Sequence, residues 1–197
     1  RYVPPAVVDA LMASGAMAHV HGERRVLTLL FCDLAGFTAA SETLAPEAVA
    51  RALNAYFTRM AHCVRSHGAT LDKFIGDAVM AFWNAPLPDA AHAARGLACA
   101  QAMQADMELL RSDWRGTPFA AVRLRVGVHT GEAAVGHMGS TERFTYTAVG
   151  DAVNTAARLE GANKALGTEI LVSGATVDTL DAQLQGTLLW LDCVLLA

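Results

Sequence analysis

The chain has 197 residues, of which 53% are hydrophobic and 17% are charged, and its formal net charge is −4. This composition excludes an intrinsically disordered chain and is sufficient for one domain with its own hydrophobic core. The negative balance argues against wholesale nucleic-acid binding, and no apolar run reaches the roughly 18 residues of a membrane-spanning helix.

The beginning of the chain predicts a lead-in segment followed by a buried strand. Residues 1–23 are expected to form a helix and linker that lead in from an upstream region, and residues 24–197 the folded domain. A strand buried on both faces is expected at 26–32, where only Thr28 interrupts the apolar run.

A helix is expected next, at 46–67, where apolar side chains recur at helical spacing between Pro46 and Gly68. The remaining elements alternate between strands and helices. In chain order they are strands at 70–75 and 78–83, a helix at 89–114, strands at 122–129, 132–138 and 144–149, a helix at 151–166, a short strand at 169–172, a short helix from 174 and a last strand at 187–195. This mixed order predicts an α+β sandwich with a largely antiparallel sheet.

Two aspartates follow apolar strand sequences in this pattern. Asp33 comes at the end of the first strand, and Asp77 lies beside Gly76 at the tip of the hairpin. If the hairpin lies beside the first strand, the two carboxylates repel each other unless a cation lies between them, a need that Mg²⁺ or Mn²⁺ meets. Gly36 and Gly76 would let the backbone approach phosphate oxygens. The structural alternative is that Asp33 caps a turn and Asp77 is an ordinary hairpin residue.

A second polar pair lies on the helix expected at 151–166. Asn154 and Arg158 are four residues apart and therefore project from one helical face. Arginine presents a planar fork of donors that suits phosphate, and asparagine can hydrogen-bond a sugar. The alternative is a solvated polar pair, which is common on helix surfaces.

The cysteines point to a reducing compartment. Cys32, Cys63, Cys99 and Cys193 lie among apolar residues and form no CxxC pair, so we expect reduced core thiols. The chain is therefore expected to be a cytoplasmic domain, of a parent whose membrane attachment the sequence leaves open.

Four motifs occur in one order along the chain: FCDLAGFT at 31–38, KFIGDAVMAFW at 73–83, VGVHTGEAAVG at 126–136 and YTAVGDAVNTAARLE at 146–160. Their order and separations resemble those of class III nucleotidyl cyclase catalytic domains. The resemblance covers Arg24 to about Val172, and it implies a ferredoxin-like α+β core that works as a dimer.

The resemblance also implies a role for each polar pair. Asp33 and Asp77 would bind two divalent cations, Mg²⁺ or Mn²⁺, with the carbonyl of Leu34 also near a metal. Asn154 and Arg158 match the pair that stabilises the transition state. In the family the two sets face each other from different chains, so a two-fold homodimer of this chain could build two identical sites. Intracellular signalling by cyclic AMP is the implied function.

The resemblance assigns the reading of the purine to Lys73 and Thr147. Lysine donates and threonine can accept, which matches N1 and the exocyclic amine of adenine, so ATP is predicted over GTP. The loop of Gly36, Phe37 and Thr38 would lie by the triphosphate. The lysine–threonine pair is similar to a subclass in which several members respond to bicarbonate, which is a further hypothesis. Lys73 could alternatively be an exposed strand lysine.

Three other functions remain as alternatives to an adenylate cyclase. The first is a guanylate cyclase, and the second is a regulatory pseudo-cyclase that binds nucleotide without turnover. A diguanylate cyclase is the third, but its GG(D/E)EF signature is absent. One departure from the family is that no lysine follows the last expected strand to reach the triphosphate, which reflects either truncation or divergence.

Overall fold

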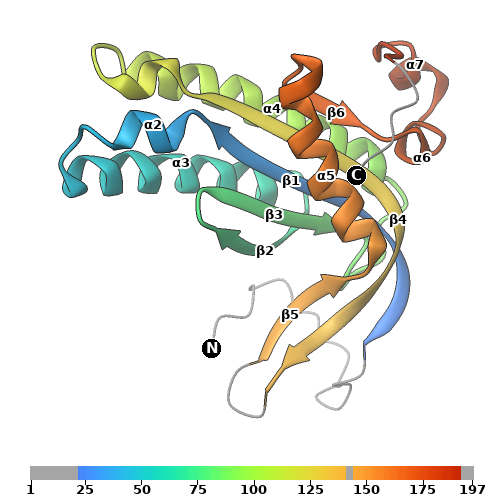
Figure 1. Ribbon diagram of the computed structural model, residues 1–197. Coiled ribbons are helices and arrows are strands. Elements are labelled where there is room, and N and C mark those ends of the chain that lie inside the picture. Colours follow the sequence, from blue (N-terminus) through green and yellow to red (C-terminus); the bar gives the residue numbers. More distant parts are fainter. Residues whose placement is uncertain (1–21, 141–143, 192–197) are drawn as a thin grey trace.

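The computed structural model describes residues 22–140 and 144–191 (Figure 1). The expected lead-in helix and Cys193 therefore lie outside the described residues. The larger elements are β1 (Glu23–Ala35), α2 (Phe37–Ser41), α3 (Pro46–Ser66), β2 (Thr70–Ile75), β3 (Ala78–Trp83), α4 (His92–Asp113), β4 (Arg123–Gly139), β5 (Phe144–Val149) and α5 (Asp151–Leu166). Short elements complete the fold: the 3-10 turn η1 (Pro118–Ala121), β6 (Ile170–Val172), α6 (Gly174–Val177) and α7 (Ala182–Gln185).

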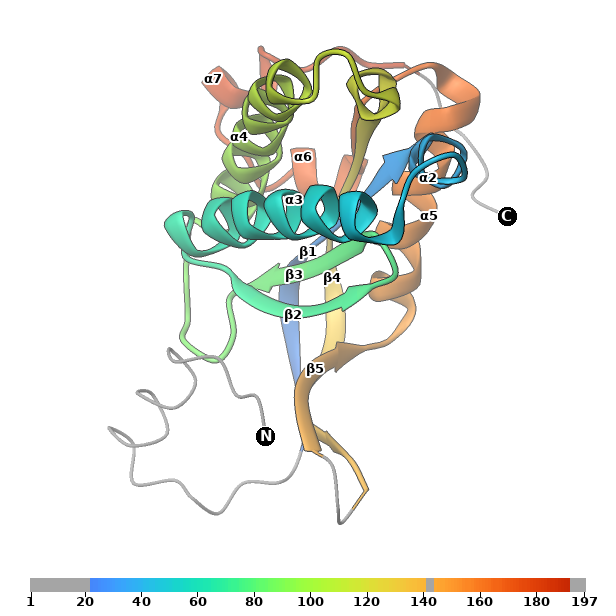
Figure 2. The same cartoon turned by 90° about the vertical axis from the view of Figure 1, so that its left-hand side faces the viewer.

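One sheet runs through the described part of the chain in the order β2-β3-β1-β4-β5, with every neighbouring pair antiparallel. The short strand β6 pairs with β4 in parallel. This confirms the predicted α+β fold with a largely antiparallel sheet. The sheet is strongly curled, so that its two edge strands, β2 and β5, approach each other (Figure 2).

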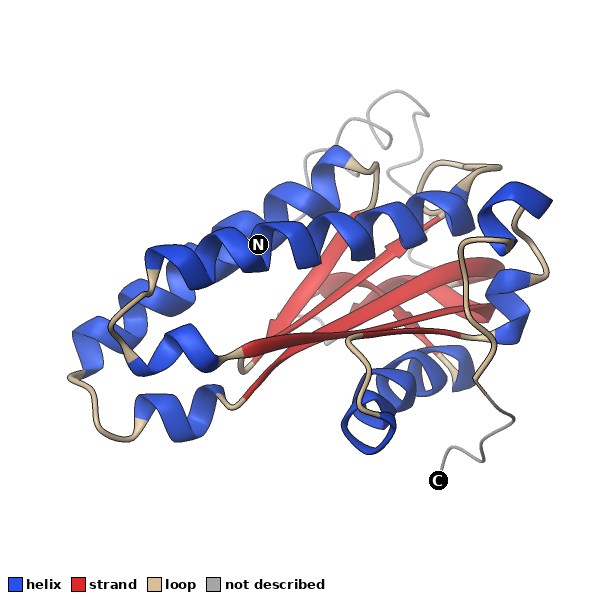
Figure 3. Cartoon of the chain, turned by 90° about the horizontal axis from the view of Figure 1, so that it is seen from above, coloured by secondary structure: helices blue, strands red, loops and turns tan. Residues whose placement is uncertain are grey.

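Helices cover both faces of the sheet, as the view from above shows (Figure 3). On one face α3 and α4 bury side chains such as Tyr56, Met60 and Met103 against Leu30 and Val126 of the central strands. On the other face α5 packs Ala152 and Ala156 into a second core. The buried positions of α3 recur every four residues, which explains why the helix expected at 46–67 forms almost as predicted.

Three predicted strands were wrong in extent. The strands expected at 122–129 and 132–138 are one continuous strand, β4, because Gly131 is not a turn residue. A Cβ at Gly131 would lie 3.0 Å from the Cβ of Ala152, so this glycine allows α5 to approach the strand. The first strand also extends beyond 26–32, and Asp33 lies within β1 instead of after its end.

The last predicted strand was also wrong over the residues that the structure describes. After α7 the chain forms turn hydrogen bonds from Thr187 and Leu188 back to Leu184 and Gln185. Their backbone groups are thereby used locally, and 187–191 contains no strand. Leu189 and Trp190 are largely exposed. The end of the expected strand, from residue 192, lies outside the described residues.

Within the described ranges, no helix is long and apolar enough to cross a membrane. Cys32, Cys63 and Cys99 are buried and carry free thiols, as expected from the sequence.

Candidate functional site

The two aspartates singled out from the sequence meet at one end of the central strands. Asp33 lies in β1, and Asp77 lies in the turn between β2 and β3, where Gly76 adopts a positive φ of 62°. Burial raises the pKa of Asp77, and the charge of Asp33 and a hydrogen bond with its side chain raise it further. The neighbourhood expected for the two carboxylates is therefore present.

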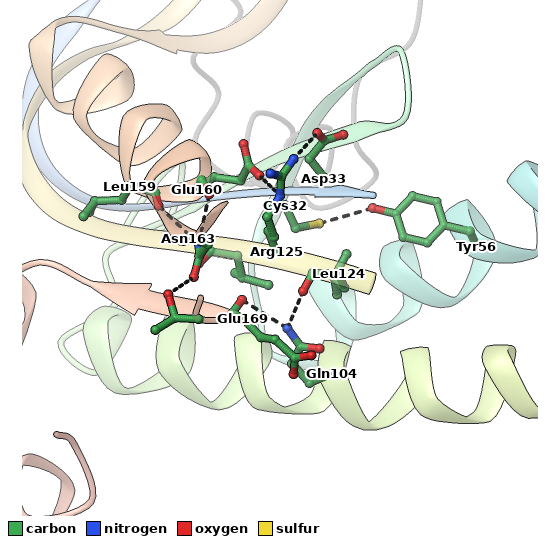
Figure 4. A network of polar contacts seen from close by, with 12 residues as sticks. Cys32, Asp33, Tyr56, Gln104, Leu124, Arg125, Leu159, Glu160, Asn163 and Glu169 are labelled. Carbon is green, nitrogen blue, oxygen red and sulfur yellow. Dashed lines mark hydrogen bonds and ion pairs between the residues drawn. The ribbon is translucent and has the colours of Figure 1, made fainter. Parts of the chain in front are cut away.

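An arginine and a glutamate that the motif analysis did not single out complete this cluster (Figure 4). Arg125 of β4 stands opposite Asp33 in the strand register, and its Nη2 lies 3.3 Å from Oδ2 of Asp33. Its Nε lies 3.1 Å from Oε1 of Glu160 on α5. Burial raises the pKa of Glu160 and the Arg125 charge opposes that shift. An arginine between two buried strand residues, Leu124 and Val126, was the signal available in the sequence.

The charges of this cluster do not balance. One guanidinium, from Arg125, faces the carboxyl groups of Asp33, Asp77 and Glu160. Fully ionised, the cluster would carry two formal negative charges, which one divalent cation would neutralise. Among the described residues no three His, Cys, Asp or Glu side chains form a ready-made metal cage. Two neighbouring carboxylates are nevertheless a donor set that suits Mg²⁺, which usually keeps waters and phosphate oxygens among its ligands.

Asn154 and Arg158 lie on the opposite side of α5 from this cluster. Successive helical residues are about 100° apart, so both lie about 200° from Ala156, which faces the sheet. Glu160 is only about 40° from Ala156 and reaches Arg125. Both Asn154 and Arg158 are exposed, and neither side chain makes a hydrogen bond or an ion pair within the described part of the chain. The structure therefore does not bring them to the carboxylates of their own chain.

The position of α5 depends on a close contact with β4. A Cβ at Gly127 would lie 2.3 Å from the backbone nitrogen of Glu160 and 2.5 Å from the carbonyl oxygen of Ala156. No side chain fits between the strand and the helix at this point. Gly127 thus sets the distance at which α5 presents Asn154 and Arg158 to its surroundings.

Lys73 and Thr147 are brought together by the curl of the sheet. They lie on β2 and β5, the two edge strands, yet Lys73 Nζ donates a hydrogen bond of 2.9 Å to Thr147 Oγ1. Thr147 in turn donates to Asp72, which precedes Lys73. Thr147 is buried, whereas the Lys73 side chain is 40% exposed and can reach a ligand.

The loop after Asp33 leads directly into the short helix α2. Gly36 adopts a left-handed conformation before the helix begins, and Thr38 is exposed. Phe37 is buried and stacks on Phe119 with ring centroids 5.3 Å apart, so its side chain anchors the loop. Leu34, whose carbonyl was assigned to a metal, is also buried. Only backbone atoms of Leu34 and Phe37 are thus available to a ligand.

Known nucleotide cyclases resemble this chain in sequence and in fold. A family model described as the adenylate and guanylate cyclase catalytic domain matches residues 20–189. Adenylate cyclase 1 of Rhizobium meliloti (strain 1021) is 42% identical over 89% of this chain, and the chain spans only 26% of that relative. The structure of the adenylyl cyclase CyaB from P. aeruginosa is similar with a TM-score of 0.73 and 36% identity, covering 81% of this chain and 82% of the other. The structure of the guanylyl cyclase Cya2 has a TM-score of 0.72 and 36% identity, covering 80% and 79%.

Proposed function

Because the chain belongs to the adenylate and guanylate cyclase catalytic domain family, we propose that it converts ATP to 3′,5′-cyclic AMP and diphosphate. The ribose 3′-hydroxyl attacks the α-phosphorus, and diphosphate leaves. The active form is a two-fold homodimer with two shared sites, each combining the carboxylates of one chain with α5 of the other. An upstream sensory region of a longer parent protein would regulate it.

The carboxylate end of the sheet would hold two divalent cations, Mg²⁺ or Mn²⁺. Asp33, Asp77 and the carbonyl of Leu34 are the proposed ligands, supported by the uncompensated negative charge around Asp77. Cations bound there would lower the pKa of the attacking hydroxyl and neutralise the triphosphate. The backbone of Gly36, Phe37 and Thr38 and the turn at Gly76 would lie along the phosphates, where the chain can approach without bulky side chains.

Residues of the partner's α5 would complete the site. Arg158 would stabilise the charge that accumulates on the α-phosphoryl oxygens, and Asn154 would hold the ribose so that the hydroxyl is in line. Their position on the outward face of the helix supports this, because a helix cannot turn these two side chains toward its own sheet while Ala156 packs there. Phe74, Ile75 and Val149 add exposed apolar surface that a second copy would cover.

Within the structure, the choice of ATP over GTP is supported by the 2.9 Å contact between Lys73 and Thr147. The two compared structures alone do not decide it, since the adenylyl and the guanylyl cyclase are both 36% identical to this chain. The relatives named adenylate cyclase, at 42% and 34% identity, favour ATP. Lysine can donate to N1 of adenine, and threonine can accept from the exocyclic amine. Guanine presents a donor at N1 instead, so a lysine there faces the wrong partner.

The test is a product assay on the purified chain with Mn²⁺ and either ATP or GTP, with cyclic nucleotides separated by chromatography. Cyclic AMP should form preferentially, and Asp33→Ala should abolish it while Asp178→Asn, an exposed carboxylate elsewhere, should not. Preferential cyclic GMP formation would make the chain a guanylate cyclase. Nucleotide binding without either product would make it a pseudo-cyclase.

The base readers are tested separately by exchanging them. Lys73→Glu combined with Thr147→Cys should shift the ATP/GTP preference toward GTP. An unshifted ratio in an active, folded variant would contradict the assignment of these two residues.

A further inference from the structure

The two residues assigned to the purine share a third neighbour, Asp72. Its side chain is completely buried, although the residue lies on an edge strand. Oδ2 accepts a 2.5 Å hydrogen bond from the hydroxyl of Thr147. Oδ1 lies 3.1 Å from Nζ of Lys73 as an ion pair, but it has no hydrogen-bond partner. A buried carboxylate is costly, so its retention beside the base-reading pair requires an explanation.

A β-bulge brings Asp72 and Lys73 to the same neighbour. Consecutive strand residues normally point to opposite faces of a sheet. Here the pairing of β2 with β3 shifts between Leu71 and Lys73, so that Asp72 is the extra residue. A bulge re-aims the side chains around it. Both Asp72 and Lys73 therefore contact Thr147 on β5.

The donors and acceptors of this triad allow only one arrangement of its protons. A lysine ammonium can only donate, and an ionised carboxylate can only accept. The hydroxyl of Thr147 receives a hydrogen bond from Lys73, so its single proton is left for an acceptor. The carboxylate of Asp72 lies 2.5 Å away and the carbonyl of Ala148 3.5 Å away, so the proton is directed to Asp72. The oxygen of Thr147 is then left with acceptor capacity alone toward any further partner.

We propose that Asp72 is a positioning residue for purine selection, which holds the Thr147 proton so that Thr147 can only accept from the base. This rests on the proposed function, in which Thr147 faces the substituent at position 6 of the purine. That substituent is a donating amine in adenine and an accepting carbonyl in guanine. Threonine alone can hydrogen-bond either one, and Asp72 makes it selective for the amine.

The variant Asp72→Asn tests this with little change in volume. The carbonyl of asparagine would turn to the Lys73 ammonium and its NH₂ group to Thr147, whose proton is then free to point at the base. We expect kcat/KM for ATP to fall about 10- to 100-fold, the usual effect of one mismatched buried hydrogen bond, with no parallel loss for GTP. Purine riboside triphosphate has no substituent at position 6, so Asp72→Asn should convert it with the same kcat/KM as the parent.

Two further variants separate positioning from folding. Thr147→Val leaves Asp72 in place and should reduce the ATP/GTP ratio of kcat/KM similarly, and adding Asp72→Asn to it should reduce the ratio no further. This keeps the proposal testable if Asp72→Asn alone fails to fold. Asp89→Asn removes the charge of another largely buried aspartate, paired with Arg95 at 3.4 Å, and should leave the ratio unchanged.

A purely structural role has a different signature. If Asp72 only stabilises the contact between the edge strands β2 and β5, Asp72→Asn should lower kcat/KM equally for ATP, GTP and purine riboside triphosphate. That result would overturn the proposal. If the parent converts no nucleotide, the proposed function fails. The ATP/GTP preference is then measured as the ratio of calorimetric affinities for the α,β-methylene analogues of ATP and GTP. An unchanged affinity ratio in Asp72→Asn, or no binding by the parent, would also overturn the proposal.

Discussion

The close contact between β4 and α5 predicts a large effect from adding one methyl group at Gly127. Its Cβ would lie 2.3 Å from the Glu160 nitrogen, whereas non-bonded heavy atoms prefer about 3.5 Å. In the variant Gly127→Ala the helix must therefore retreat by about 1 Å. Both close contacts are backbone atoms, so no side-chain rotation relieves them.

Two measurable losses follow from this displacement. Overpacking of this kind costs about 1–3 kcal/mol in unfolding free energy, which lowers Tm by roughly 3–10 °C in a domain of this size. A shift of about 1 Å in a catalytic element can cost about 100-fold in rate. We expect both when Tm is measured by circular dichroism and kcat by cyclic AMP production at 25 °C.

A matched control uses the same substitution at a glycine with open space. A Cβ at Gly174 would meet nothing within 4 Å, so Gly174→Ala should change neither quantity appreciably. If Gly127→Ala has the Tm and kcat of the parent, the idea that this glycine sets the position of α5 is refuted.

The exposed residues of α5, the buried thiols and the response to bicarbonate can each be tested as well. Arg158→Ala and Asn154→Ala should each lower kcat by about two to three orders of magnitude. Neither should lower Tm, because both side chains are exposed, and a lowered Tm would point to a structural role. Burial raises the pKa of the Cys32 and Cys63 thiols to about 12, and it raises the pKa of Cys99 as well. In a Cys193→Ser background a thiol reagent at pH 8 should therefore react only after denaturant is added, and rapid reaction of the native chain would contradict their burial. Bicarbonate, titrated at fixed pH, should raise turnover, and unchanged turnover would remove that hypothesis.

The fold was largely predictable because its strands and helices carry strong local patterns. The hairpin strands at Thr70–Ile75 and Ala78–Trp83 and the helix Asp151–Leu166 form with the predicted bounds. The glycine at 131 misled the prediction, because a glycine that allows a helix to approach a strand has the same sequence signal as one that allows a turn. That distinction depends on α5, which is distant in the sequence.

The candidate site was predictable only where a motif marks it. Asp33 and Asp77 were expected to meet, and they do. Arg125 and Glu160 were missed because their pairing requires the register of β1 with β4 and the docking of α5. Asp72 was missed for a related reason, since strand alternation places it away from Lys73 and only a bulge and the curl of the sheet bring both to one partner.

The central claim is that each site is built from two chains, and complementation tests it most directly. Asp33→Ala and Asn154→Ala chains, each inactive alone, are co-expressed with different tags and purified through both. Such a heterodimer contains one intact site of two, so we expect about half the parental turnover. A heterodimer of Asp33→Ala with Asp77→Ala, which damages the same half of both sites, should stay inactive. The shared site would be contradicted if the heterodimer of Asp33→Ala with Asn154→Ala is inactive, or if the heterodimer of Asp33→Ala with Asp77→Ala is equally active. Failure of the tagged chains to associate would contradict it too.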